Sequence, residues 1–169
     1  MKNSYSNIFS FNKKILKKTI KNLNNGNIVG LPTETVYGLG GNAYSKKSIE
    51  KIYKLKERPR SNPLIVHYLN LKDASKDIVV NERFKKLYAR FCPGPITFVL
   101  KKRCGSKINP LSTARLKTVA IRFPKHKVIR SIFAGRMGDA GKDPIPEFKK
   151  SIKISKKFKN VEILWASTR

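Results

Sequence analysis

The chain has 169 residues, of which 40% are hydrophobic, so it suits one folded domain with a core and is too apolar for a disordered protein. It carries 38 Lys and Arg residues against 10 Asp and Glu residues, which gives a formal net charge of +28. A charge of this sign favours polyanionic partners such as nucleic acid, nucleotides or an acidic membrane surface, although lysine-rich codon usage would explain the same excess.

Composition also excludes two classes of protein. The chain has 2 cysteines and lacks a CxxC motif, which argues against a secreted disulfide framework. No apolar run is long enough to span a bilayer, and the N-terminus lacks the apolar block of a signal peptide. We therefore expect a reduced, cytoplasmic protein that does not associate with membranes.

In chain order, the first half predicts a helix, a short buried strand, a second helix and a second strand, at Asn12–Leu23, Ile28–Leu31, Ser45–Lys56 and Leu64–His67. The second half predicts a third helix, two strands, a fourth helix and a last strand, at Asn81–Phe91, Ile96–Leu100, Thr118–Phe123, Glu147–Lys157 and Val161–Trp165. Because strands and helices alternate, the fold class is α/β.

The first candidate site follows the strand Ile28–Leu31. Hydroxyls and Glu34 come directly after Pro32, and Gly38, Gly40 and Gly41 come next. Glycines and hydroxyls after a strand expose backbone N–H groups and let a ligand approach closely. The segment lacks the spacing of a P-loop or a GxGxxG motif. A tight turn that needs glycine torsions is the alternative.

Two further clusters contain cations. The first is a Pro-flanked loop with the next strand, and it comprises Lys54, Lys56, Arg58, Arg60, Asn62 and His67. Its donors suit phosphate oxygens, although a solvated basic loop would look the same. In the other cluster, the period of a strand puts Thr118, Ala120 and Arg122 on one face. A buried arginine there needs an anion, whereas an edge-strand arginine would lie in solvent.

Four motifs occur in order: PTETVYGLG (32–40), KERPRSNPLIVH (56–67), PGPITFVL (93–100) and TVAIRFPKH (118–126). Together they resemble the YrdC/TsaC family, the L-threonylcarbamoyladenylate synthases, over about Asn24 to Phe133. The resemblance implies a YrdC-like α/β fold, in which helices and a twisted mixed sheet surround a positively charged cavity.

The resemblance also implies a nucleotidyltransferase reaction. L-Threonine, bicarbonate and ATP would yield threonylcarbamoyl-AMP and pyrophosphate. Downstream threonylcarbamoyl transferase proteins would place the threonylcarbamoyl group on adenosine 37 of tRNA. ATP is then a substrate, Mg²⁺ is expected with its triphosphate, and no protein metal site is predicted.

By similarity to the family, the residues that contact L-threonine would be Thr35, His67 and Arg122. Those that contact ATP would be Lys56, Arg58, Asn62 and Thr118. Lys56 and Arg58 would also be catalytic, because cations must hold the triphosphate while pyrophosphate leaves. Arg122 would fix the threonine carboxylate so that the amine points toward bicarbonate. The only acid of the first motif, Glu34, receives no role.

The resemblance ends near Phe133. The family's later Ser-Ala-Asn…Ser-Gly motif has no counterpart here, and residues from about 131 to 169 resemble a transaldolase fragment. Arg136 and Ser167 match its sugar-phosphate positions. We expect a truncated YrdC-like domain at 1–133 and a chimeric βαβ-like tail at 134–169, produced by recombination or by an assembly error. A divergent natural tail is the alternative.

Two other functions stay open at this point. A YrdC-like module could bind double-stranded RNA or tRNA without catalysis, in keeping with the positive charge. A truncated chimera could also be inactive, because lost strands would expose sheet edges.

Overall fold

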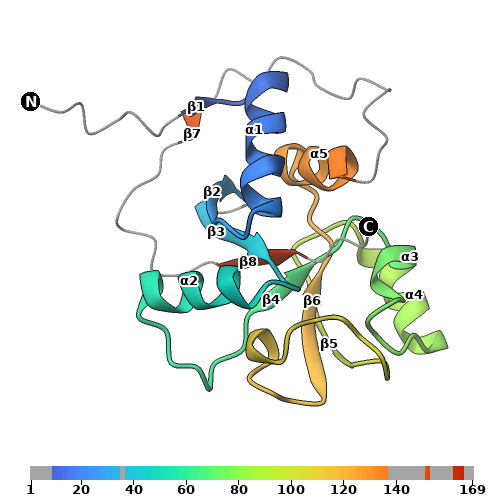
Figure 1. The fold of residues 1–169 in the computed structure, drawn as a ribbon. Helices are drawn as coiled ribbons and strands as arrows, with labels where there is room; N and C mark the ends of the chain where they lie inside the picture. Colours follow the sequence, from blue (N-terminus) through green and yellow to red (C-terminus); the bar gives the residue numbers. More distant parts are fainter. Residues whose placement is uncertain (1–8, 35–36, 137–150, 153–161, 166–169) are drawn as a thin grey trace, which may run out of the picture.

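The computed structural model describes residues 9–34, 37–136, 151–152 and 162–165, and helices flank a mixed sheet (Figure 1). The sheet is six-stranded in the order β2-β3-β8-β4-β6-β5. Its strands are β2 (Val29–Pro32), β3 (Tyr37–Asn42), β4 (Ile65–His67), β5 (Thr97–Lys101), β6 (Thr118–Arg122) and β8 (Glu162–Trp165). The predicted α/β class is confirmed.

The inner strands of this sheet are parallel, and its two outer pairs are antiparallel. β3, β8, β4 and β6 run parallel, while β2 pairs antiparallel with β3 and β5 pairs antiparallel with β6. β8 lies between β3 and β4, where Trp165 is in register with Asn42 and His67. The predicted strand near the C-terminus is thus part of the main sheet.

A second, small sheet corrects one prediction. β1 (Phe9–Ser10) pairs antiparallel with β7 (Ser151–Ile152). The helix predicted for Glu147–Lys157 is therefore wrong at residues 151–152, because their backbone is extended and paired with another strand. The rest of that predicted helix lies outside the described residues.

The three early helices begin as the sequence predicts. They are α1 (Lys13–Asn24), α2 (Lys46–Lys56) and α4 (Glu82–Phe91). The side chains of the N-cap residues Asn12, Ser45 and Asn81 each accept a hydrogen bond from a backbone N–H of the first turn, at 2.9, 3.3 and 2.8 Å. The sequence did not predict α3 (Leu71–Ala74), the 3₁₀ helix Pro110–Thr113 or α5 (Lys127–Arg136).

The core consists of two clusters. The larger contains buried side chains of α2, β4, α4 and β6, among them Ile52, Val66, Phe84 and Ile121. The second joins α1, β2 and α5, which lie close together in Figure 1. α5 thus buries the apolar face of α1.

The glycines of β3 are required by close side-chain contacts and not by a positive backbone φ. Neither Gly40 nor Gly41 has a positive φ. A Cβ on Gly40 would lie 2.8 Å from Leu31 Cδ1, and one on Gly41 would lie 3.0 Å from Ile52 Cδ1. The interpretation of these two residues as a tight turn is therefore wrong. They are in a strand that neighbouring side chains approach closely.

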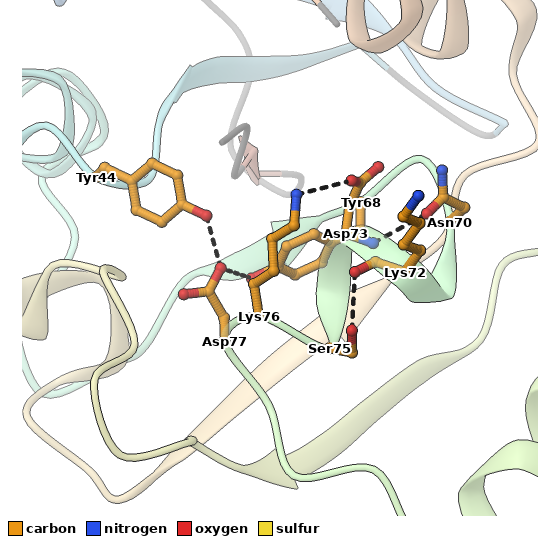
Figure 2. A network of polar contacts seen from close by, with 8 residues as sticks. All are labelled: Tyr44, Tyr68, Asn70, Lys72, Asp73, Ser75, Lys76 and Asp77. Atoms are coloured by element: carbon orange, nitrogen blue, oxygen red, sulfur yellow. Dashed lines mark hydrogen bonds and ion pairs between the residues drawn. The ribbon is translucent and has the colours of Figure 1, made fainter. Parts of the chain in front are cut away.

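A buried carboxylate fixes the segments around α3 (Figure 2). Asp77 is 1% exposed, and its Oδ2 accepts hydrogen bonds from the hydroxyls of Tyr44 at 2.6 Å and Tyr68 at 2.9 Å. Its Oδ1 accepts from the Ser106 hydroxyl at 2.8 Å and the Lys107 N–H at 3.1 Å. Burial, followed by the Asp77 charge, raises the pKa of Tyr68. With every oxygen bonded, Asp77 is a structural acid.

No helix in the described part of the chain has the length and apolar content needed to cross a bilayer.

Candidate active site

The candidate site is built on one face of β4, β5 and β6. Along β6, Val119 and Ile121 are buried in the core, while Thr118, Ala120 and Arg122 alternate with them and are half-buried. The predicted shared face of these three residues is therefore confirmed. We call this side of the three strands the site face.

Neighbouring strands extend the site face in rows. Arg122 is in register with His67 on β4 and with Thr97 on β5. Because residues in register project to the same side of a sheet, the three side chains share the site face. The next row contains Ile65, Ala120 and Val99, and Val99 is 67% exposed. A polar row thus borders a small apolar platform.

Arg122 is held by the neighbouring strand. Its Nε and Nη2 donate hydrogen bonds to Thr97 Oγ1 at 3.0 and 2.8 Å. The sequence analysis did not single out Thr97, although it lies in the PGPITFVL motif. The alternation of β5 opposite β6 is the signal that could have found it. His67 beside Arg122 is only 3% exposed.

The turn between β2 and β3 also reaches this end of β6. Glu34 Oε1 accepts hydrogen bonds from the backbone N–H groups of Lys125 at 2.6 Å and His126 at 3.0 Å. Burial of the Glu34 carboxyl acts to raise its pKa. Hydrogen bonds from the N–H groups of Glu34, Lys125 and His126, and then the charge of His67, outweigh burial and lower it. Thr35, predicted to contact threonine, lies outside the described residues.

His126 is half-buried beside Glu34. Burial lowers the pKa of its imidazole, and the Glu34 carboxylate acts against that shift. Its Nδ1 is buried and has no hydrogen-bond partner within the described part of the chain.

The basic loop after α2 is ordered by its own hydrogen bonds. Arg58 Nε donates to the Asn62 carbonyl at 3.0 Å, and Nη2 donates to Asn62 Oδ1 at 2.6 Å and to the Pro63 carbonyl at 2.9 Å. Tyr53 contributes its hydroxyl to the Asn62 carbonyl at 2.9 Å. Lys56 is the last residue of α2, and Glu57 ends the helix with φ 50°. The structure thus brings Arg58 and Asn62 together, directly after Lys56 in the chain.

The predicted residues fall into two groups by their place along β4 and β6. Arg58 and Asn62 precede β4, and Thr118 is the first residue of the parallel strand β6. His67 and Arg122 are the last residues of the same strands. Four residues of a strand span roughly 13 Å. The groups are therefore at opposite ends of β4 and β6, separated by a distance comparable with an extended nucleoside triphosphate.

A cavity of about 410 Å³ lies elsewhere. Residues of α1, β2, α2 and the turn between α1 and β2 line it, among them Lys18, Asn22, Asn27 and Lys51. None of the predicted site residues does so. Because His67, Arg122 and Thr97 share the site face, we assign the candidate site to that face and not to this cavity.

Among the described residues, no group of three or more His, Cys, Asp or Glu side chains could hold a metal ion. The Glu34 Oε1 is bonded to backbone N–H groups.

Comparison with known proteins identifies the family to which this fold belongs. Residues 21–141 match the Sua5/YciO/YrdC family, which is described as Telomere recombination. The chain therefore belongs to this family. It is 43% identical over 106 residues to the threonylcarbamoyl-AMP synthase of Bacillus subtilis strain 168, and 43% identical over 107 residues to that of Pyrococcus abyssi. These matches cover 62% and 61% of the chain.

Solved structures agree with the fold. The crystal structure of Pyrococcus abyssi Sua5 complexed with L-threonine matches with a TM-score of 0.69 and 32% identity. The match covers 74% of this chain and 36% of that one. Escherichia coli YciO matches with a TM-score of 0.66 and 20% identity over 75% of this chain and 61% of its own, which is evidence for the fold alone. The predicted YrdC-like α/β fold is confirmed.

The chain spans 30% of the length of the Bacillus subtilis and Pyrococcus abyssi synthases. The family match continues to residue 141, past the predicted junction at residues 131–133, and α5 runs through that junction without interruption. The comparisons give no support to the resemblance of the tail to transaldolase. Arg136 ends α5, and Ser167 lies outside the described residues.

Proposed function

We propose that the chain carries the substrate site of a threonylcarbamoyl-AMP synthase, a nucleotidyltransferase that joins L-threonine, bicarbonate and ATP. The observation that carries the proposal is the row of Thr97, Arg122 and His67 across β5, β6 and β4, with Glu34 at its end. The threonine-bound relative is similar in sequence and in fold. The relatives named above carry the same activity in their names.

In this proposal Arg122 binds the carboxylate of L-threonine. Its Nη1 and the remaining proton of Nη2 are directed away from the Thr97 hydroxyl, so a guanidinium edge is available for a bidentate contact. His67 beside it, and Thr35 from the PTETVYGLG motif, would contact the rest of the amino acid. The carboxylate contact fixes the direction of the amine, which must be neutral to react with bicarbonate.

The reaction then proceeds in two steps. The neutral amine forms a C–N bond to the carbon of bicarbonate, and water leaves to give the carbamate. A carbamate oxygen attacks the α-phosphorus of ATP, and the bond to pyrophosphate breaks. Lys56 and Arg58 would hold the triphosphate and the charge that develops on pyrophosphate, while Asn62 and Thr118 would contact the nucleotide. Mg²⁺ would accompany the phosphates.

The predicted ATP residues and the predicted threonine residues are separated along β4 and β6, which suits a reaction between two substrates. Arg58 and Asn62 precede β4 in the chain and Thr118 is the first residue of β6, whereas His67 and Arg122 are the last residues of these strands. ATP would be held at the first ends and threonine at the last ends, so the carbamate and the α-phosphate would meet between them. The apolar row of Ile65, Ala120 and Val99 lies between these ends and would keep that space free of competing charges.

The product would feed the modification of adenosine 37 in tRNA by downstream threonylcarbamoyl transferase proteins, in the cytoplasm. The boundary between a domain at 1–133 and a tail at 134–169 stays a prediction.

Direct binding of substrate tests the proposal. Isothermal titration with L-threonine should show saturable binding by the intact chain, and Arg122→Ala should weaken it by about 10- to 100-fold, the value of hydrogen bonds to a charged group. Arg122→Lys keeps the charge but not the planar fork, so it should restore only part of the affinity. Equal L-threonine affinity in wild type and Arg122→Ala contradicts the proposed contact.

An RNA-binding module is the second candidate. The observation in its favour is α1, whose exposed face carries Lys13, Lys14, Lys17 and Lys21 and whose span contains no acid. RNA binding with a steep salt dependence, together with no affinity for L-threonine or ATP, favours this function over the synthase.

A further inference from the structure

Glu34 is the acid to which the sequence assigned no role, and it connects segments that are distant in the chain. Its Oε1 accepts the backbone N–H groups of Lys125 and His126, which are 91 and 92 residues away. At 2.6 Å the first is short for an N–H···O hydrogen bond, and at 3.0 Å the second has an ordinary length. The charge of His67 also acts on the Glu34 carboxylate and helps to lower its pKa. Glu34 thus binds the segment that follows β6, the strand that ends at Arg122.

The hydrogen bonds of Glu34 reach the start of α5. Lys125 and His126 come directly before the first residue of this helix, Lys127, and the Arg130 N–H donates to the His126 carbonyl at 3.1 Å. The N–H groups of a helix start lack partners within the helix and carry a partial positive charge. A carboxylate is therefore the matching acceptor, which is why the pKa of Glu34 falls although burial acts to raise it.

A second contact fixes the same turn from the other side. Arg130 Nη1 donates to the carbonyl of Leu69 at 3.3 Å and to that of Pro124 at 3.4 Å. Leu69 follows β4 shortly after His67, and Pro124 follows β6 shortly after Arg122. The first turn of α5 thus joins the ends of β4 and β6, and Glu34 adds the turn between β2 and β3 to them.

We infer that Glu34 is a positioning residue, which holds the end of β2 against the start of α5 and so sets the affinity of the site for its amino-acid substrate. Thr35 follows Glu34 directly in the chain, and the N–H groups that Glu34 binds follow Arg122, the last residue of β6, by three and four residues. Loss of the carboxylate would release the turn after β2 from the start of α5, while the hydrogen bonds of the basic loop at Arg58 would stay in place. The inference rests on the proposed function, which supplies the substrate.

The test compares Glu34→Ala, Glu34→Gln and wild type by two independent measurements. Amide hydrogen exchange at Lys125 and His126 reports whether the carboxylate holds these N–H groups. Titration with L-threonine, and separately with ATP, reports the effect on the site. Glu82→Ala is the matched control, because it also removes one acidic charge but lies on the surface of α4, paired only with Lys85 in the described structure.

For Glu34→Ala we expect exchange of both amides to accelerate, and the Kd for L-threonine to rise, by about tenfold or more. The ATP affinity should stay within about twofold, because the Arg58 loop is not in contact with Glu34. Glu34→Gln keeps an acceptor oxygen without the charge and should lie between Glu34→Ala and wild type. The unchanged ATP affinity distinguishes positioning from a general loss of stability, because a general loss would weaken the binding of both ligands.

Two results overturn the inference: unchanged exchange at Lys125 and His126 in Glu34→Ala, or an unchanged Kd for L-threonine in a variant whose amides do exchange faster. A different result bears on the proposed function. If the wild type binds no L-threonine, the proposed substrate is wrong and the substrate role of Glu34 falls with it. The amide exchange would then still decide whether Glu34 holds the start of α5.

Discussion

Replacing Asp77 by alanine removes the acceptor of four hydrogen bonds at once. The two tyrosine hydroxyls, the Ser106 hydroxyl and the Lys107 N–H all donate to its carboxylate. Asp77 is 1% exposed, and so is Tyr68. After the substitution, the hydroxyls of Ser106 and Tyr44 can turn toward water, because these residues are partly exposed. The Tyr68 hydroxyl has no such option.

The expected loss of stability follows from these contacts. A buried donor left without a partner costs about 1–3 kcal/mol, and a hydrogen bond to a charged group contributes about 1.5–3 kcal/mol. We therefore expect Asp77→Ala, which loses several such bonds, to lower the free energy of unfolding by about 3–5 kcal/mol. Tyr68→Phe removes a single donor to this charge, so it should cost only about 1–2 kcal/mol.

Equilibrium unfolding in urea measures this loss. With a slope of about 2 kcal/mol per molar urea, the midpoint of Asp77→Ala should fall by roughly 1.5–2.5 M at an unchanged slope. The exposed variant Glu82→Ala is the control and should change stability by less than about 0.5 kcal/mol. A midpoint of Asp77→Ala within about 0.3 M of wild type would refute the assignment of Asp77 as a structural acid.

Other predictions concern the nucleotide end of the site face and the thiols. Arg58→Lys loses the fork that binds the Asn62 and Pro63 oxygens, and Lys56→Ala loses a cation, so each should weaken ATP binding by about tenfold in a titration. Unaltered ATP affinity in both variants contradicts the assignment of this loop to phosphate. Burial raises the pKa of Cys92 to about 11, whereas Cys104 is exposed. At pH 8, iodoacetamide should therefore label Cys104 roughly a hundredfold faster, as followed by peptide mass spectrometry; equal rates would show that the Cys92 thiol is accessible and ionised.

Local signals account for the elements that the sequence predicts well. Asn12, Ser45 and Asn81 each precede an amphipathic run, and in the structure each caps its helix. Capping depends on one side chain and the next three residues, so it can be recognised without knowledge of the rest of the fold. The alternation along Thr118–Arg122 is local in the same sense.

Apart from α5, the elements that sequence analysis missed or misassigned depend on distant contacts. β3 contains glycines that disfavour a strand in isolation, yet Leu31 and Ile52 from other elements occupy the space a Cβ would need. The helix predicted at Glu147–Lys157 is wrong at Ser151–Ile152, because these residues pair with the distant strand β1. α5 could have been found, because Val128, Ile129, Ile132 and Phe133 recur at helical spacing and are buried.

The same distinction holds in the site. The motifs predict Arg122 and His67 individually, but only the register of β4, β5 and β6 shows that they share a row with Thr97. The role of Glu34 could not be read from its neighbours, since its partners are more than ninety residues away. Residue types thus indicate the chemistry of this site, while the pairing of strands determines which residues meet.

Release of pyrophosphate by the purified chain, with ATP and bicarbonate and with or without L-threonine, tests the central claim most directly. The proposed synthase predicts release that requires both L-threonine and bicarbonate and that Arg122→Ala reduces strongly. Release that is independent of L-threonine, or no release from a chain that binds both ATP and L-threonine, would contradict the claim that the site described here performs the complete reaction.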